Sequence, residues 1–232
     1  KGLDYDYATN WSFHPLETLT YFIPSFFGFS SAYAVDVQGQ EASLPLYWGW
    51  MPFTDSTVYF GIIPIILSAV ALVYKRNKSI IFFALFTVII LLISFGKFFF
   101  FYDVLFNILP YFNKFRAPSM ILHLLPLTFG MLAAYGMSFL IELPAKLDTV
   151  KLKKGLYITI GIIGAILIIG FLGKSSIYSA LSGSLFEKEG DLQQLQQQYG
   201  AQAQQALAQL KEIRFGLLWN DYIKFALISI TS

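Results

Sequence analysis

The sequence predicts an all-α protein, a polytopic bundle of transmembrane helices with extracytoplasmic interfacial helices and loops. Three observations predict this fold class: the composition, the apolar blocks of membrane-spanning length, and the unequal distribution of basic residues among the loops. The chain of 232 residues is 56% hydrophobic and 13% charged, whereas an ordinary soluble domain carries about 25% charged residues. Its mean hydropathy of +0.60 also indicates an integral membrane protein.

Four apolar blocks are long enough to cross a bilayer, which takes roughly 17–25 residues. These blocks are Val58–Tyr74, Ser79–Phe95, Pro118–Leu143 and Leu156–Leu172, and a truncated fifth block begins near Tyr222. Each block is apolar around its whole circumference, as a helix surrounded by lipid and other helices must be. Pro64 and Pro126 lie inside blocks, where we expect kinks because neighbouring groups can satisfy the freed carbonyls.

Basic residues in the short loops predict the orientation. Lys75, Arg76 and Lys78 separate the first two blocks, and a cluster of lysines between residues 146 and 154 separates the third from the fourth. Both loops lie on one side if every block crosses, and that side should be cytoplasmic. The first 57 residues carry six acids and one base, so we expect them outside, together with the loop from 96 to 117.

These features divide the chain into four predicted regions. Residues 1–57 form an extracytoplasmic aromatic loop with an interfacial helix, and residues 58–173 form four transmembrane helices with short loops. Residues 174–221 form an extracytoplasmic, amphipathic Gln/Ala-rich segment, which is one helix or a helix pair broken at Gly200. Residues 222–232 begin a fifth transmembrane helix, and we expect the chain to be an internal piece of a longer protein.

Local signals predict shorter elements outside the apolar blocks. The polar run "TDST" offers Thr54, Asp55 or Ser56 as a cap for the first transmembrane helix. The aromatic stretch 96–115 should contain a short helix from about Phe101 to Leu109 that ends near Pro110.

The chemistry-bearing residues exclude several classes of protein. The chain has no cysteine, so it has no disulfide and no thiolate site. No phosphate-binding loop, GxGxxG or HExxH motif occurs, and a net charge of +2 is too small to indicate a nucleic-acid partner.

Two histidines remain as candidates for chemistry. His14 lies three residues before Glu17, which places the two side chains on one face of a helix. The pair could transfer protons or bind a metal, or it could cap and orient the start of a helix. His123 lies inside the third block, where we expect a buried neutral side chain or a proton relay.

Three stretches resemble, in order, the outer-loop and span motifs of the YfhO-like bacterial membrane proteins, which are similar to the C-type glycosyltransferase superfamily. The stretches are "HPLETLTYFIPSFFGF", "YWGWMPFTDSTVYFGIIPIILSAVAL" and "FNKFRAPSMILHLLPLTFGMLAAYGM". The resemblance covers Tyr5 to Leu143. It implies a polytopic protein of the bacterial inner membrane that transfers a sugar from a polyprenyl-phosphate-linked donor to an extracytoplasmic cell-envelope acceptor.

The resemblance also implies that the catalytic acid lies in a first outer loop N-terminal to this chain, so the catalytic residue is unassigned. Arg116, in "YFNKFRAPSM", is the first candidate to bind a lipid phosphate through its guanidinium fork; a snorkelling boundary residue is the alternative. Lys97 and Lys114 are second candidates. Further candidates to contact sugar, lipid or acceptor are Tyr47, Trp48, Trp50, His14 and Glu17, although the aromatic residues could instead form a plain interfacial belt.

Two other functional classes stay open. A lipid or polysaccharide transporter or flippase would need a polar path through the membrane, and a non-catalytic membrane assembly protein would use the Gln/Ala-rich helix to dock a partner. The expected partners are a lipid-linked sugar donor, an envelope acceptor and membrane lipids, without nucleic acid. No cofactor is assigned with certainty, no metal ligand is assigned, and a divalent metal stays an alternative.

Overall fold

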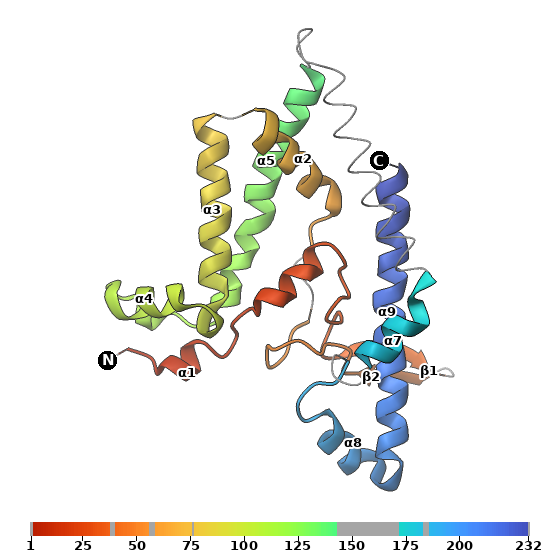
Figure 1. Ribbon diagram of the computed structural model, residues 1–232. Helices are drawn as coiled ribbons and strands as arrows, with labels where there is room; N and C mark the ends of the chain where they lie inside the picture. Colours follow the sequence, from red (N-terminus) through yellow and green to blue (C-terminus); the bar gives the residue numbers. More distant parts are fainter. Residues whose placement is uncertain are drawn as a thin grey trace. The chain divides into compact units, whose positions relative to one another are not determined.

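Helices dominate the computed structural model, which describes residues 2–37, 40–55, 59–75, 77–142, 172–182 and 186–231 (Figure 1). The prediction of a mostly helical protein is therefore confirmed. The chain forms two units. Unit 1 comprises Lys1–Phe22, Trp50–Phe53 and Val58–Leu143, and unit 2 comprises Ile23–Gly49, Thr54–Thr57 and Pro144–Ser232.

Unit 1 contains five α-helices and four short 3₁₀ helices among its described residues. The α-helices are α1 (Tyr5–Ala8), α2 (Ile62–Tyr74), α3 (Lys78–Ser94), α4 (Phe100–Ile108) and α5 (Leu125–Ile141). The 3₁₀ helices are Pro15–Tyr21, Gly96–Phe98, Phe112–Lys114 and Pro118–Leu124.

The first two apolar blocks form helices whose bounds follow local capping. Asn77 precedes α3, and its side chain accepts a hydrogen bond from the Ile80 N–H at 2.8 Å, as an N-cap should. α2 begins only at Ile62, because Gly61 has φ +97° and the helix has no side-chain cap. The predicted cap from "TDST" is therefore wrong.

The third block is one continuous helical segment of mixed geometry. Pro118 begins the 3₁₀ helix, and Pro126 lies in the first turn of α5, where its missing N–H costs little. At Pro126 we expected a kink within one helix, and the structure instead has a change there from 3₁₀ helix to α-helix. His123 is exposed, which contradicts the predicted burial.

Pro118–Ile141 spans 24 residues and is long and apolar enough to cross a membrane. Within the described residues it is the one helix that meets this criterion. α2 and α3 are apolar but shorter, with 13 and 17 residues. The predicted block Leu156–Leu172 lies almost entirely outside the described residues.

The three long helices of unit 1 pack through small and polar side chains. A Cβ at Gly136 of α5 would clash with the Leu67 carbonyl of α2, so glycine permits this close approach. The Thr87 hydroxyl of α3 donates to the Thr128 hydroxyl of α5 at 2.9 Å. Close helix contacts of this kind are frequent between helices in membranes.

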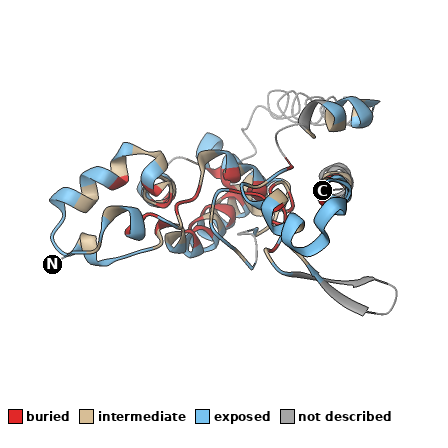
Figure 2. Ribbon diagram, turned by 90° about the horizontal axis from the view of Figure 1, so that it is seen from below, coloured by how far each residue is buried: buried red, intermediate tan, exposed pale blue. Residues whose placement is uncertain are grey.

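Buried apolar residues of unit 1 gather where its helices meet the N-terminal segment. This core consists of Phe13, Tyr21, Ile90, Leu122 and Leu125. The outer faces of the helices are also apolar, and Figure 2 shows exposed residues along much of the helical ribbon. Large exposed apolar side chains include Ile81, Phe82, Leu85 and Val88 of α3 and Leu127, Met131 and Met137 of α5.

Unit 2 contains one hairpin and three α-helices in its described part. The strands β1 (Tyr33–Val37) and β2 (Gln40–Leu44) pair antiparallel, with Tyr33 opposite Leu44. The helices are α7 (Lys174–Leu181), α8 (Asp191–Tyr199) and α9 (Ala203–Thr231). The prediction of an all-α chain did not include the hairpin.

The Gln/Ala-rich segment is a helix pair. α8 ends at Gly200, which has φ +54°, a conformation that glycine adopts readily. A short 3₁₀ helix, Gly200–Gln202, leads into α9. Of the two predicted alternatives, the helix pair broken at Gly200 is therefore confirmed and the single helix is not. α9 continues without interruption through Tyr222, where we expected a new helix to begin.

Candidate functional site

Three parts of the chain that are far apart in sequence meet at one end of unit 1: the N-terminal segment, the end of α3 and the start of the third block. The N-terminal segment lies beside the start of the third block, because the Ala117 and Ser119 N–H groups donate to the carbonyls of Ala8 and Trp11. The Phe13 N–H donates to the Ser94 carbonyl at the end of α3. α1 and α4 lie at this same end (Figure 1).

Gly96 is the point of closest contact at this end. A Cβ there would lie 2.0 Å from Ser12 Oγ and 3.0 Å from Pro118 Cγ, and Gly96 has φ +47°. The Ser12 hydroxyl accepts from the Lys97 N–H at 3.1 Å and donates to the Thr9 carbonyl. Glycine at 96 therefore lets the two connections approach, and Ser12 links them.

His14 caps the 3₁₀ helix Pro15–Tyr21. Its Nδ1 accepts from the Leu16 N–H at 3.2 Å, so Nδ1 carries no proton in this arrangement. The imidazole stacks on the Trp50 indole with ring centroids 3.7 Å apart, and the Phe98 ring meets it edge-on at 4.7 Å. Burial lowers the pKa of His14. The predicted capping role is confirmed.

Glu17 lies in the interior of unit 1. Its side chain is 1% exposed, and Oε1 accepts from the Trp50 N–H at 3.1 Å. The Tyr21 hydroxyl is also buried and has no hydrogen-bond partner among the described residues. Burial and the nearby Glu17 charge raise the pKa of Tyr21. Glu17 thus positions the Trp50 backbone. Trp50 itself is 44% exposed.

Arg116 lies at the same end as His14 and Trp50, with its side chain exposed. Its Nη1 donates to the Tyr7 hydroxyl at 2.6 Å, and its guanidinium lies 5.9 Å from the centre of the Tyr7 ring. A tyrosine hydroxyl does not neutralise the charge, and Arg116 forms no ion pair within the described residues. The cation is therefore oriented and available to an anion.

Two further exposed cations belong to this end. Lys114 Nζ lies 4.9 Å from the centre of the Tyr111 ring, and Lys97 Nζ lies 5.5 Å from that of Phe98. Tyr111 and Ala117 have φ of +66° and +57°, which is uncommon for residues with a Cβ. These two strained positions bracket the segment that carries Lys114 and Arg116.

Tyr47 and Trp48 belong to unit 2, whereas the other candidates belong to unit 1, and they are 3% and 5% exposed. Lys188 Nζ lies 4.7 Å from the centre of the Tyr47 ring, and the Arg214 guanidinium lies 5.8 Å from that of Trp48. Stacking of these two residues on a sugar stays a prediction. The structure thus brings together six of the eight candidates: His14, Glu17, Trp50, Lys97, Lys114 and Arg116.

Sequence reasoning missed Tyr7, Ser12 and Tyr21. Tyr7 and Ser12 act through contacts with residues more than 80 positions away, Arg116 and Lys97, so no local pattern identifies them. Tyr21 carries a detectable signal, since it follows Glu17 by one helical turn in a segment that is otherwise apolar.

Sequence reasoning also missed the buried Arg214 in unit 2. Its side chain is 0% exposed, and Nη1 binds Asp191 Oδ2 and the Phe186 carbonyl while Nη2 donates to the Pro45 carbonyl at 2.6 Å. A signal was present, because Arg214 continues the buried stripe formed by Ala203, Leu207, Leu210 and Leu218. A charged residue on the apolar stripe of a helix needs a buried partner.

The arrangement in unit 1 favours recognition of an amphiphilic anion. Exposed cations and an exposed indole adjoin helices whose outer faces are apolar. Among the described residues, no three His, Asp or Glu side chains gather where they could hold a metal ion.

No family model, curated protein or solved structure matches the chain.

Proposed function

We propose that this chain is part of a membrane glycosyltransferase of the C type, which transfers a sugar from a polyprenyl-phosphate-linked donor to a cell-envelope acceptor. We also propose that the protein is related to the YfhO-like family and that it crosses the bacterial inner membrane several times. One observation supports it above the others: Arg116 is exposed, oriented by Tyr7, and without an ion-pair partner in the described part of the chain.

A lipid-linked donor brings its phosphate to the membrane boundary. The guanidinium of Arg116 can bind two phosphate oxygens at once, and it would stabilise the charge that develops on the leaving phosphate. Lys97 and Lys114 add positive charge at the same end. The exposed Trp50 indole offers a flat surface for a sugar ring or an isoprenoid chain.

The buried Glu17 has a positioning role in this proposal. Its Oε1 accepts from the Trp50 N–H, and the residue is 1% exposed, so we assign it to holding the Trp50 backbone. The catalytic base of the proposed reaction is unassigned.

The test is sugar transfer by the full-length protein in liposomes that contain a polyprenyl-phosphate sugar and candidate acceptors. Loss of hydrogen bonds to a charged group costs roughly 1.5–3 kcal/mol, so Arg116→Ala should lower kcat/KM about 10- to 100-fold. Lys78→Ala is the matched control, because Lys78 is an exposed cation at the opposite end of α3.

Two results would contradict the proposal at different levels. If Arg116→Ala and Lys78→Ala transfer sugar at the wild-type rate, the role of Arg116 is wrong. If the protein consumes no lipid-linked donor but moves lipid-linked sugar between the leaflets, the flippase alternative replaces the transferase.

A further inference from the structure

A groove in unit 2 is lined by glutamine side chains. Its volume is about 620 Å³, which lies within the range of roughly 300–1,000 Å³ typical of ligand sites. Its walls come from α8, the 3₁₀ helix Gly200–Gln202, the first turns of α9, and Ser43–Pro45 at the end of β2.

The rim of the groove consists of amides. Gln194, Gln198, Gln202, Gln205 and Gln209 line it, and all five are exposed. Within each helix a spacing of four residues places the amides on one face, with Gln194 and Gln198 on α8 and Gln205 and Gln209 on α9. None of these five amides has a hydrogen-bond partner within the described residues, so their donors and acceptors are available to a ligand.

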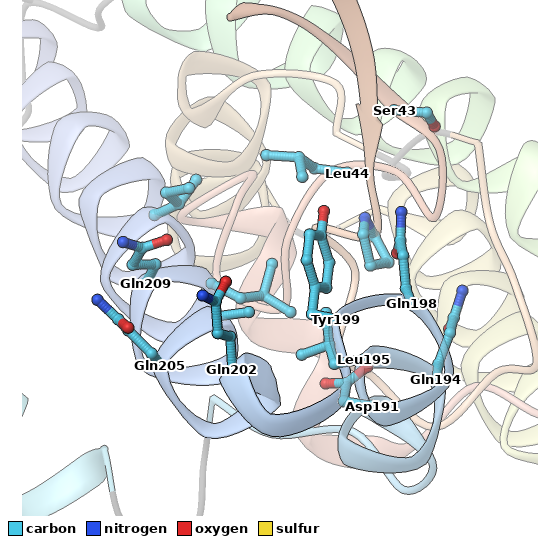
Figure 3. Close-up of a pocket in the computed structure, with 14 residues that line it drawn as sticks. Ser43, Leu44, Asp191, Gln194, Leu195, Gln198, Tyr199, Gln202, Gln205 and Gln209 are labelled. Atoms are coloured by element: carbon cyan, nitrogen blue, oxygen red, sulfur yellow. The ribbon is translucent and has the colours of Figure 1, made fainter.

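The floor of the groove is apolar and holds one aromatic ring. Leu195 and Leu210 close it from below, and Leu210 is 4% exposed. Tyr199 is 47% exposed. Figure 3 shows its ring between Gln198 and Gln202, pointing toward Leu44.

The lining carries no available charge. Asp191 is its one ionisable acid or base apart from the Tyr199 phenol, and Oδ2 of Asp191 binds Arg214 Nη1 and the Lys188 N–H. Because Asp191 is 6% exposed and neutralised by Arg214, an ionic ligand would find no counter-charge here.

We propose that this groove binds a neutral, polyhydroxylated ligand, namely a strand of uncharged sugar units. A sugar hydroxyl both donates and accepts, and a glutamine amide offers one acceptor oxygen and two donor hydrogens. The Tyr199 ring can stack on the apolar face of a sugar ring. A peptide helix suits the site less well, because the apolar floor lies beneath a rim of amides. The proposal goes beyond the transferase function and does not depend on it.

The experiment measures binding of neutral hexasaccharides to the full chain in phosphatidylcholine nanodiscs, prepared without sugar-headed detergent. Glucan, mannan and galactan hexamers serve as probes, and a galacturonate hexamer is the charged comparison. Saturation-transfer NMR detects binding, and calorimetry gives the Kd. We expect at least one neutral hexamer to bind and the charged hexamer to bind at least tenfold more weakly.

The decisive comparison uses two triple variants with the same change in composition. Gln194→Ala/Gln198→Ala/Gln202→Ala alters the groove, whereas Gln193→Ala/Gln197→Ala/Gln204→Ala alters exposed amides on the same helices outside its lining. Alanine favours helix in both, and circular dichroism checks the fold. The groove variant should lose affinity at least tenfold, and the control should retain it.

Three outcomes would overturn the proposal: no neutral hexamer binds the wild-type chain, both triple variants bind alike, or the charged hexamer binds as tightly as the neutral one. Groove-dependent binding of an amphipathic peptide in place of saccharide would make this face a protein interface instead.

Discussion

His14 illustrates how one side chain at the end of unit 1 serves both the backbone and the surface. Its Nδ1 caps the 3₁₀ helix, while its ring stacks on Trp50. Protonation of Nδ1 would remove the acceptor that the Leu16 N–H needs. The neutral imidazole is therefore the form that holds Trp50 and the start of this helix in place.

This role predicts a pH dependence of stability. Burial lowers the pKa of His14 in the folded protein from an ordinary value of 6.5, so the unfolded chain binds more protons just below pH 6.5. The contribution of His14 is complete above that pH and declines as the pH falls toward the folded pKa. The Tm of the solubilised protein should drop between pH 7.5 and 5.5, and the drop should be smaller in His14→Asn, whose side chain can also cap.

The role of His14 in the pH dependence would be contradicted if Tm changed with pH in the same way in wild type and in His14→Asn. Thermal unfolding, followed by tryptophan fluorescence at several pH values, makes the comparison. A parallel decline in both proteins would assign the pH dependence to other groups.

The sequence identified some of the site residues but not the residues that orient them. His14 and Arg116 could be chosen because "FHPLE" and "FRAPS" place them beside prolines at helix starts, and local signals of that kind are read directly from the chain. The partners that orient them, Trp50 and Tyr7, depend on contacts across 36 and 109 positions. Only the folded chain shows those contacts.

Long apolar runs predicted α3 and the third block to within a few residues, because each run ends where the polar residues of the loops begin. α4 occupies Phe100–Ile108, close to the expected 101–109. α2 is shorter than predicted because Gly61 adopts positive φ. The hairpin β1–β2 was missed because its short strands lie in a stretch that we read only as part of an aromatic loop.

α9 depends on the buried arginine in its interior. Arg214 joins α9 to Asp191 of α8, to the Phe186 carbonyl and to the Pro45 carbonyl, and it lies over the Trp48 ring. These bonds hold α8, α9 and the segment after β2 together within unit 2. Their loss would leave Asp191 as an uncompensated buried charge.

Arg214→Ala should therefore destabilise unit 2 strongly. Removing one partner of a buried ion pair costs about 3–5 kcal/mol. Lys211→Ala is the matched control on the same helix, because Lys211 pairs with the partly exposed Glu187 at 2.6 Å, and such pairs contribute about 0–1 kcal/mol. Chemical unfolding and limited proteolysis between α8 and α9 measure the difference. Equal loss in the two variants would show that the Arg214 contacts contribute no more than a surface pair.

At the scale of the whole molecule, unit 1 has two chemically different ends. One end carries His14, Trp50 and the cations Lys97, Lys114 and Arg116, none of which forms an ion pair with another described residue. The other end carries Lys75 Nζ, bonded to Glu142 Oε2 at 3.3 Å and to the Ser138 hydroxyl at 3.0 Å. α3 and the third block run between these ends with exposed apolar side chains, which in water would form an unusually large patch.

The proposed function requires that α3 crosses the membrane and that the Arg116 end of unit 1 faces outward. The chain has no cysteine, so no residue of the chain itself competes with an introduced cysteine for the label. Lys78→Cys reports the start of α3, and Phe115→Cys reports the exposed position beside Arg116. The most direct measurement is labelling of both variants with a membrane-impermeant maleimide, in intact and in permeabilised bacterial cells.

We expect Phe115→Cys to be labelled in intact cells and Lys78→Cys to be labelled only after permeabilisation. Labelling of both positions from the same side would show that α3 does not cross the membrane. Labelling of Lys78→Cys alone in intact cells would place the Arg116 end in the cytoplasm and contradict the proposed site for an outer lipid-linked sugar.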